Sequence, residues 1–265
     1  MAPAPVFDSP HPLVFAHRGG ALLAPENTMP AIDNGMALGA DGLEIDVQLS
    51  SDGVPVVIHD QALDRTTDRT GPVKHLAVAE LERVDAGYRF ERDGQFPFRG
   101  QGIGIPRLDD VLKKHLNARI IIEMKGGQPE LARAVAASIR QANAVERCCV
   151  GSFYASSVKV MRREHPEIVT SASQPESRWT VHRSWVRWPW IGARPYVAYQ
   201  LPEVAGRLRV VSPALVRQVH KEGQVVQVWV VNHPDDIRRL LDWGVDGIIS
   251  DRPDTAIATR DQWVR

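Results

Sequence analysis

The sequence predicts one (β/α)8 barrel, and three features support this prediction. Eight short runs rich in Val, Ile and Leu recur along a chain of 265 residues. Segments with the periodicity of amphipathic helices separate most of these runs, which is the pattern of parallel strands joined by crossover helices. Eight strands in about 250 residues suit a closed barrel better than an open doubly wound sheet, which usually has fewer strands.

The expected strands are short apolar runs between turn signals. They are Leu13–Ala16, Gly42–Leu49, Ile120–Met124, Cys148–Ser152, Ile168–Ser171, Tyr196–Gln200, Val225–Val230 and Gly247–Ser250. The expected helices are Thr28–Leu38, Leu108–Leu116, Pro129–Ala142, Ser156–Glu164, Pro213–Lys221 and Pro234–Trp243. Several of them begin at Ser, Thr or Pro, and Gly39, Gly223 and Gly244 are expected to cap helix C-termini.

Two stretches depart from this alternation of strands and helices. Val54–Ile58 follows a Ser-Asp-Gly turn and has the composition of an extra strand. Residues 60–106 are long and weakly periodic, so we expect a small insertion after the second strand of the barrel. With this insertion included, we expect residues 1–265 to form a single domain.

The composition excludes several classes of protein. Lys plus Arg and Asp plus Glu each number 32, so no net charge draws the protein to nucleic acid or to an anionic membrane. The two cysteines, Cys148 and Cys149, are neighbours in an apolar strand and are expected to be reduced core residues on opposite faces. Met1–Pro12 lacks the pattern of a signal peptide, and no run of about eighteen apolar residues predicts a transmembrane helix. We therefore expect a cytoplasmic protein.

Polar residues at strand ends are the candidate site residues, because a (β/α)8 barrel carries its chemistry at the C-terminal ends of its strands. The first strand runs into His17 and Arg18, followed by two glycines that allow a ligand to approach the backbone closely. An arginine beside a histidine suits a bound phosphate. The extra strand ends at a second histidine, His59.

Three carboxylates follow the same logic. Glu44 and Asp46 lie two residues apart on the second strand, so they point to one side and can share a hard divalent cation. Taken alone, this pair is better explained as exposed carboxylates on an alternating strand. Glu123, at the end of the next barrel strand, supplies a third oxygen ligand and favours an Mg²⁺ or Ca²⁺ site, while Lys125 suits a phosphate oxygen. With the two histidines, this set suits phosphoryl transfer.

At these motifs the sequence resembles the glycerophosphodiester phosphodiesterase family. The matching blocks are Ala16-His17-Arg18-Gly19, Pro25-Glu26-Asn27-Thr28, Gly42-Leu43-Glu44-Ile45-Asp46-Val47, Ser51-Asp52-Gly53, His59-Asp60, Leu63-Asp64-Arg65-Thr66-Thr67, Ile105-Pro106-Arg107-Leu108, Glu123-Met124-Lys125, Trp229-Val230-Val231-Asn232 and Gly244 to Pro253. They occur in order from residue 13 to about residue 255 and are jointly specific, although no single block is. Small departures, such as Met124 and Val230 in place of more usual residues, do not touch the proposed chemistry.

The resemblance implies a (β/α)8 barrel with an insertion after the second strand, and it implies roles. Three carboxylates would bind a divalent cation, two histidines would be the general acid and base, and two basic residues would hold phosphate oxygens. The three carboxylates are Glu44, Asp46 and Glu123. The histidines are His17 and His59, and the basic residues are Arg18 and Lys125. The glycerol 2-hydroxyl would attack phosphorus, and water would then open the cyclic phosphate to give glycerol 3-phosphate. Which histidine acts as the acid stays open, because imidazole serves in either role near neutral pH.

Several neighbouring residues admit two interpretations. Asn27 and Thr28 are expected to cap the first helix rather than to contact substrate. Trp229 is expected either to stack on the substrate or to pack the mouth of the barrel. Asp246 and Asp251 are expected to fix turns and loops rather than to bind metal.

The segment from Trp179 to Trp190 holds four of the seven tryptophans, interleaved with arginines. It lies between the fifth and sixth expected strands, where a loop at the catalytic face reaches the pocket. Tryptophan beside arginine suits a membrane interface or an acyl chain next to a phosphate, so one hypothesis is that the protein also accepts lysophospholipids and contacts membranes peripherally. The alternative is that these tryptophans pack a long loop against the barrel.

Two other functions compete with glycerophosphodiester hydrolysis. A lysophospholipase D or sphingomyelinase D-like enzyme shares the two histidines and the metal site but acts on lipids. A barrel that binds phosphorylated ligands without catalysis is the more distant alternative, because all the proposed catalytic residues are present. The sequence leaves the oligomeric state open.

Overall fold

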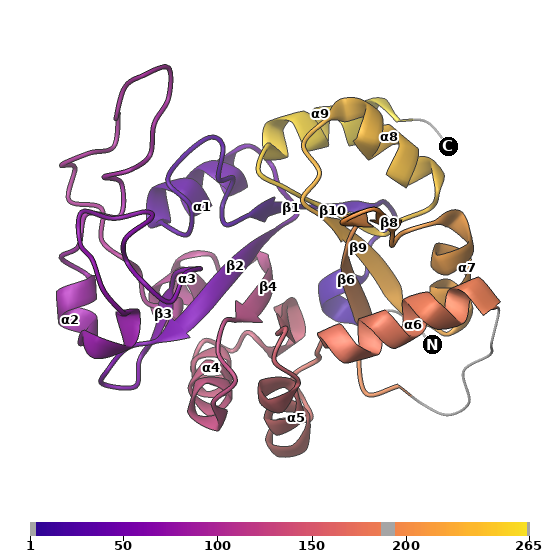
Figure 1. Cartoon of the computed structure of the whole chain (residues 1–265), viewed down its shortest axis with the longest axis horizontal. Helices are drawn as coiled ribbons and strands as arrows, with labels where there is room; N and C mark the ends of the chain where they lie inside the picture. Colours follow the sequence, from indigo (N-terminus) through magenta and orange to yellow (C-terminus); the bar gives the residue numbers. More distant parts are fainter. Residues whose placement is uncertain (1–3, 187–193, 264–265) are drawn as a thin grey trace.

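The computed structural model describes residues 4–186 and 194–263, and parallel strands form its centre (Figure 1). Seven of them lie in the order β5-β4-β2-β1-β10-β9-β6, which spans β1 (Leu13–His17), β2 (Gly42–Leu49), β4 (Arg119–Met124), β5 (Cys148–Gly151), β6 (Ala198–Pro202), β9 (Val225–Trp229) and β10 (Gly247–Ser250). Parallel bridges from Val150 to Thr170 and from Ser171 to Ala198 join the two edge strands. The prediction of a (β/α)8 barrel is confirmed. The fifth expected strand, Ile168–Ser171, is wrong as a regular strand, because only these two isolated bridges form there.

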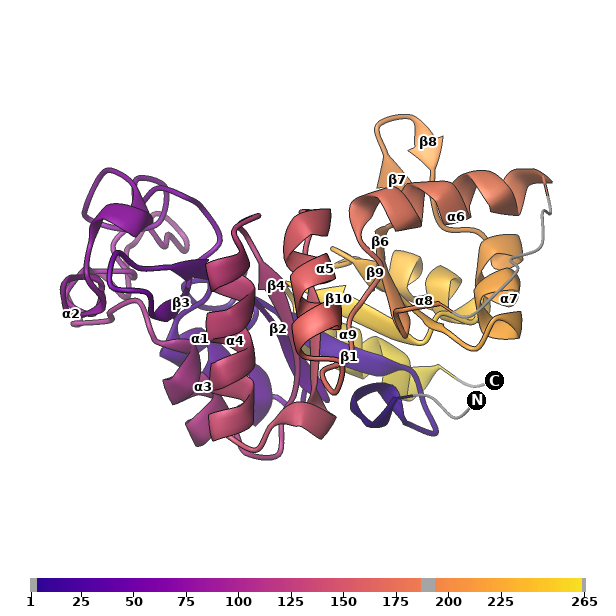
Figure 2. The same ribbon diagram turned by 90° about the horizontal axis from the view of Figure 1, so that it is seen from below.

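Helices surround this sheet on its outer side (Figures 1 and 2). They are α1 (Met29–Ala37), α3 (Leu108–Lys114), α4 (Pro129–Gln141), α5 (Ala155–Glu164), α6 (Gln174–Val186), α7 (Pro213–Lys221), α8 (Pro234–Asp242) and α9 (Pro253–Gln262). The six expected helices form within two residues of their expected bounds. The positive φ angles of Gly39, Gly223 and Gly244 confirm the expected caps. Helices α6 and α9 were not expected.

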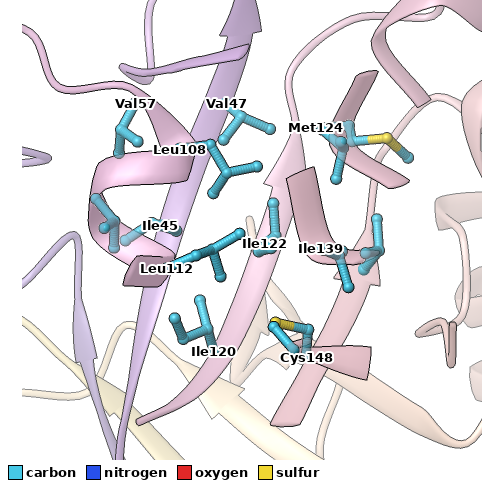
Figure 3. Close-up of a cluster of buried hydrophobic side chains, with 14 of the residues drawn as sticks. Ile45, Val47, Val57, Leu108, Leu112, Ile120, Ile122, Met124, Ile139 and Cys148 are labelled. Atoms are coloured by element: carbon cyan, nitrogen blue, oxygen red, sulfur yellow. The ribbon is translucent and has the colours of Figure 1, made fainter. Parts of the chain in front are cut away.

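Alternation along the strands separates the outer apolar layer from the barrel interior. Ile45 and Val47 of β2 point outward and pack against Leu108 and Leu112 of α3 (Figure 3). Cys148 belongs to this outer layer. Cys149 packs inside the barrel with Phe15, Ile121 and Ile249. Both cysteines are buried and free, as expected from their adjacent positions. The same alternation turns the even-numbered residues of β2 inward.

The segment between residues 60 and 106 lies to one side of the barrel, at the left of Figure 1. It follows β3 (Pro55–Val57), the expected extra strand, which pairs antiparallel with β2. The segment contains α2 (Val78–Leu81) and a 3₁₀ turn at Val73–His75, and two further 3₁₀ turns lie at Pro5–Phe7 and Val145–Arg147. It packs its own apolar cluster, which includes Leu63 and Leu81.

A two-stranded hairpin, β7 (Val204–Ala205) and β8 (Leu208–Arg209), follows β6 directly. In Figure 2 this hairpin projects beyond α6 on one side of the barrel, past the ends of β6 and β9. None of the helices within the described ranges has both the length and the apolar composition needed to cross a bilayer.

Candidate active site

Strand register brings the expected site residues together at the C-terminal end of the barrel. Parallel pairing of β1 with β2 sets His17 beside Glu44. Pairing of β2 with β4 sets Asp46 beside Glu123. Each of these side chains points inward, because the apolar residues between them face the outer helices. A cleft of about 200 Å³ opens here, and among the expected site residues it is lined by His17, Arg18, Glu44, His59, Glu123, Lys125 and Trp229.

The three carboxylates form one compact group. One oxygen from each of Glu44, Asp46 and Glu123 lies within 4.8 Å of the oxygens of the other two. Asp46 is 1% exposed and Glu44 is 6% exposed. Within the described residues, Glu44 Oε2 is buried and receives no hydrogen bond. An unsatisfied buried carboxylate oxygen is costly, and an oxygen set of this kind is what a hard divalent cation binds.

Burial and mutual repulsion perturb the acidity of this group. Burial, followed by the charge of Asp46, raises the pKa of Glu44 to about 8. Burial also raises the pKa of Glu123 despite the nearby ammonium of Lys125. The pKa of Asp46 moves the other way: burial alone would raise it, but the charges of Lys125 and Arg18 outweigh that effect and lower it. Burial and mutual repulsion therefore oppose ionisation of Glu44 and Glu123, while Asp46 is held ionised by its basic neighbours.

Two basic side chains border the carboxylates. Lys125 Nζ lies 2.9 Å from Asp46 Oδ1 and 2.9 Å from Glu123 Oε1. Arg18 donates from Nη1 to Glu26 Oε1 at 2.8 Å, and its Nε lies 3.1 Å from Asp46 Oδ2. Both cations line the cleft, so their positive charge faces the space beside the carboxylates. This is the placement expected for groups that attract a phosphodiester.

Each histidine has a carboxylate partner on its Nδ1. His17 Nδ1 lies 2.6 Å from Asp251 Oδ1, and His59 Nδ1 lies 2.5 Å from Asp60 Oδ1. A carboxylate at this position favours a proton on Nδ1 and leaves Nε2 for the ligand side. His17 Nε2 lies 3.7 Å from Glu44 Oε2.

The two imidazoles differ in acidity. Burial lowers the pKa of His17, but the hydrogen bond with Asp251 and the charge of Glu44 outweigh it, so the pKa is raised above the ordinary histidine value. Burial is also the largest influence on His59, and there, together with the charges of Lys125 and Arg18, it prevails over the charge of Asp46 and the hydrogen bond with Asp60, so the pKa is lowered. The two environments thus shift the pKa values of two identical side chains in opposite directions.

A salt-bridge network missed in the sequence connects the two halves of the site. Arg65, from the segment after β3, donates to both oxygens of Glu26 at 2.7 and 2.8 Å and from Nε to Asp60 Oδ2 at 2.6 Å. Glu26 binds Arg18, and Asp60 binds His59. Burial tends to raise the pKa of Asp60, but the bonds from Arg65 and His59 lower it to about 2. The only sequence signal for these residues was their place inside the matching blocks.

The structure changes two of the expected capping and loop roles, those of Asn27 and Asp251. Thr28 caps α1 as expected, accepting from the backbone NH of Ala31 at 3.4 Å. Asn27 instead holds Asp46, donating from Nδ2 to Oδ2 at 2.8 Å and accepting from the Asp46 NH at 3.2 Å. It has a left-handed φ of 58°, so its amide reaches back to β2 rather than along α1. Asp246 fixes a loop as expected, accepting from the NH of Val226.

Asp251 does more than fix a loop. It partners His17, and Asn232 holds it in turn: Asn232 Nδ2 donates to Asp251 Oδ2 at 3.1 Å, and Asn232 Oδ1 accepts from the Asp251 NH at 2.9 Å. These residues are 234 and 19 positions apart from Asp251 in the chain. The sequence could not show this contact, because β1 and β10 become neighbours only when the barrel closes.

The tryptophan-rich segment differs from its expected form. Part of it is α6 rather than a loop, and Trp179 and Trp185 are 56% and 51% exposed. Of the arginines in and beside this segment, Arg183 is 2% exposed and lies 3.2 Å from Glu222 Oε1, and Arg194 also pairs with Glu222. Trp188 and Trp190 lie outside the described residues.

A barrel whose acidic, basic and imidazole groups converge on one cleft is typical of barrel enzymes that act on phosphate esters. The sequence profile of the glycerophosphoryl diester phosphodiesterase family matches residues 17–255. The chain belongs to this family. It is accordingly a phosphoric diester hydrolase with glycerophosphodiester phosphodiesterase activity. These findings favour an enzyme over the alternative of a non-catalytic phosphate-binding barrel.

Similar proteins match this chain over nearly its whole length. A glycerophosphodiester phosphodiesterase of Caldanaerobacter subterraneus is 34% identical over 250 residues, which cover 92% of this chain and 96% of the relative. The crystal structure of such an enzyme from Agrobacterium tumefaciens has a TM-score of 0.76 at 30% identity, covering 93% of this chain and 99% of that one. A phosphodiesterase of Oleispira antarctica, solved with its product sn-glycerol-3-phosphate, has a TM-score of 0.76 at 25% identity, covering 95% and 98%.

Proposed function

We propose that this enzyme hydrolyses glycerophosphodiesters to glycerol 3-phosphate and an alcohol with the aid of a divalent cation. The observation that carries the proposal is the group of three inward carboxylates set between two histidines at one cleft. Residues 1–265 would act as one catalytic domain, with the insertion at residues 60–106 contributing Arg65 to the salt bridges around the site. A cytoplasmic location stays a prediction.

Glu44, Asp46 and Glu123 would hold the cation, and their donor set fits Mg²⁺ or Ca²⁺ equally. The buried oxygen of Glu44 that receives no hydrogen bond from the described part of the chain supports this assignment. When bound, the cation supplies positive charge that neutralises the phosphate and stabilises charge developing on its oxygens. Arg18 and Lys125 would hold phosphate oxygens from the side of the cleft.

His17 and His59 would move the protons. One imidazole accepts the proton of the glycerol 2-hydroxyl as its oxygen attacks phosphorus, and the other gives a proton to the departing alcohol oxygen. The P–O bond to the alcohol breaks and a cyclic phosphate forms. The roles then reverse: the second imidazole accepts a proton from water, whose oxygen attacks phosphorus, and the first returns its proton to the 2-oxygen. Asp251 and Asp60 would keep both rings oriented through these steps.

Phosphorus NMR of glycerophosphocholine and glycerophosphoethanolamine tests this function. We expect glycerol 3-phosphate with Mg²⁺ or Ca²⁺ and none with chelator. The His17→Ala variant should lose at least about 10²-fold in rate, the usual range for a general acid or base. The matched control is His233→Ala, because His233 is exposed at the start of α8. Equal rates in chelator, or an active His17→Ala variant, would overturn the proposal.

Lysophospholipids are a second candidate substrate class, in line with the lysophospholipase D or sphingomyelinase D-like alternative. Such substrates require apolar space beside the phosphate site. Phe153 and Trp229 meet edge to face there, with ring centroids 6.1 Å apart, and both line the catalytic cleft. Trp229 is therefore proposed as a substrate contact at this apolar side. Replacing it with Ala should raise KM more than it lowers kcat.

Peripheral membrane contact through the segment Trp179–Trp190 stays a hypothesis. The exposure of Trp179 and Trp185 supports it, because tryptophan is favoured at the bilayer interface. Co-sedimentation with phosphatidylcholine vesicles checks it: binding that is unchanged in the Trp179→Ala, Trp185→Ala double variant would rule this surface out.

A further inference from the structure

A second, larger cavity adjoins the catalytic cleft, and its volume is about 370 Å³. Cavities of about 300–1,000 Å³ are usual for small-molecule sites. The cavity and the cleft share four lining residues, which are Glu123, Phe153, Gln200 and Trp229. A molecule bound in the cleft therefore has direct access to this cavity, which we call the side chamber.

Helix α6 lines one side of the side chamber, mostly with polar residues. The lining positions follow the helical spacing i, i+3, i+4, i+7 and i+8, and they are Gln174, Ser177, Arg178, Val181 and His182. A helix that covers an apolar space usually places apolar residues at this spacing, but of these five residues only Val181 is apolar. The α6 side of the chamber therefore suits a polar ligand.

Arg178 brings to the side chamber a positive charge that its own helix does not neutralise. Its neighbours at i−4 and i+4 are Gln174 and His182, and neither is a carboxylate. Glu176, the acidic residue of α6, binds Arg162 of α5 at 2.7 Å instead. Within the described part of the chain, no residue forms a hydrogen bond or an ion pair with the Arg178 guanidinium, which is exposed. This guanidinium is therefore available to an anion.

The strand side of the side chamber adds a second group without a partner. Gln200 Nε2 is buried and donates to no acceptor among the residues that the structure describes. A Cβ atom on Gly151 would lie 2.6 Å from Ser171 Oγ and 3.1 Å from Gln200 Oε1, so a larger residue there would crowd these two polar side chains. Both of them line the chamber. A buried donor without an acceptor is costly, and a ligand oxygen would satisfy it.

We infer that the side chamber binds the departing alcohol and favours an alcohol that carries an anionic group of its own, a phosphate or a carboxylate. This inference rests on the proposed function, because the phosphate of the diester must lie in the cleft. Glu123, the acidic residue that lines the chamber, lies 2.9 Å from Lys125 Nζ. Its charge is therefore already paired, and Arg178 determines the sign of the charge that the chamber favours.

The division of the substrate between cleft and chamber follows from the chemistry. His17 and His59 line the cleft and do not line the chamber, so glycerol, whose 2-hydroxyl must reach an imidazole, stays in the cleft. In an in-line displacement the alcohol departs on the side of phosphorus opposite the attacking oxygen. The rest of the alcohol then extends into the chamber, where Gln200 donates to its oxygens and Arg178 binds its anionic end.

Three substrates test the inference and separate the two kinds of anion. The neutral reference is the sn-glycero-3-phosphodiester of 1,3-propanediol. One arm adds a phosphate monoester to its terminal hydroxyl, and the other arm uses the diester of 3-hydroxypropanoate, which ends in a carboxylate. With the free cation concentration held constant, we expect the anion to raise kcat/KM at least about tenfold in one arm or in both, mainly by lowering KM. Equal values for all three substrates would overturn the inference.

A charge reversal tests the location. Arg178→Glu places a negative charge at the side chamber, whereas Arg217→Glu makes the same change at an exposed position of α7 that does not line it. We expect Arg178→Glu to lower the ratio of kcat/KM for the anionic substrate to that for the neutral one at least about tenfold, and Arg178→Lys to restore part of it. Arg217→Glu should keep the parent ratio. An unchanged ratio in Arg178→Glu, or an equal fall in both Glu variants, would contradict the location.

Binding of phosphodiesters that cannot cyclise separates this inference from the proposed function. Methyl 3-hydroxypropyl phosphate and its terminal phosphate ester have no hydroxyl on the carbon next to the diester-bearing one, so the proposed internal attack cannot occur. Calorimetry with the cation present should show tighter binding of the anionic ligand to the parent and to Arg217→Glu, but not to Arg178→Glu. That result supports the chamber even if no diester is hydrolysed. Hydrolysis of glycerophosphocholine with no preference for the anion, in turnover or in binding, supports the function and refutes the chamber.

Discussion

One carboxylate on each histidine of the site determines the orientation of its imidazole ring. Asp251 and Asp60 each bind an Nδ1, and each is itself held by another side chain, Asn232 or Arg65. Partners of this kind fix the tautomer and the orientation of the ring. The chemistry that we propose at Nε2 would therefore depend on residues that do not face the substrate.

Replacing Asp251 with Asn should lower the pKa of His17. The hydrogen bond and charge of Asp251 raise this pKa against the lowering effect of burial, so their removal leaves burial less opposed. Proton NMR titration of the His17 ring checks the direction of the shift. We also expect a loss of about 10- to 100-fold in kcat/KM, the range typical of outer partners.

Asp254→Asn is the matched control for that experiment. Asp254 lies three residues further along and pairs with Arg252 at 2.7 Å. It should change neither the titration nor the rate. A His17 pKa that is the same in the parent and Asp251→Asn proteins would show that Asp251 only packs beside the ring.

At the scale of elements, the loop after β1 approaches α1 closely enough to require glycine. A Cβ atom on Gly19 would lie 2.6 Å from the backbone of Ala31 and Ile32, and the residue has a φ of 84°. Beside Gly19, the NH of Asn27 donates to the carbonyl of Arg18 at 2.9 Å, so this loop is tied to the segment that carries Asn27. The glycine that the sequence suggested for close approach of a ligand thus also serves the packing of loop on helix.

Gly19→Ala should therefore destabilise the protein by about 3 kcal/mol or more, because the backbone conformation and a steric clash both oppose it. Gly39→Ala is the control: its φ is 90°, but apart from its chain neighbours no residue that the structure describes has an atom within 4 Å of the added Cβ. That variant should cost only about 1 kcal/mol. Urea denaturation measures both, and equal losses would mean that the close contact is relieved by movement of α1.

At the scale of the whole molecule, the site forms only when the barrel closes. The carboxylates come from β2 and β4, the histidines from β1 and the end of β3, and Asp251 follows β10. Closure gathers three carboxylates in a buried place, and the raised pKa of Glu44 and of Glu123 means that ionisation of these two groups opposes folding. Cation binding should therefore contribute to the stability of the whole fold.

Adding Mg²⁺ or Ca²⁺ should raise the thermal midpoint, by an amount equivalent to about 2.7 kcal/mol at a hundredfold excess over Kd. Glu44→Gln should remove most of this response and, near neutral pH in chelator, should be at least as stable as the parent, since the parent must protonate Glu44 or bury its charge on folding and glutamine needs neither. Differential scanning calorimetry with and without metal checks both results. A parent protein that is insensitive to both ions would contradict the proposed cation site.

Much of the fold was predictable because strand and helix patterns are local. Seven of the eight expected barrel strands form, since their apolar runs are short and bounded by turn residues. Ile168–Ser171 fails as a strand because only two bridges hold it. Helix α6 escaped prediction because its buried face contains Thr180, Arg183 and Ser184, so it lacks the apolar stripe of an amphipathic helix.

The sequence by itself determined the barrel and the residues that converge at its mouth. Spacing along a strand decides which side chains share a face, and the C-terminal ends of parallel strands meet at one end of a barrel. Only the tertiary structure decided the partners of those residues. The contacts of Asp251 with His17 and of Asn27 with Asp46 join segments that are separate in the chain, and contacts of that kind have no local sequence pattern that predicts them.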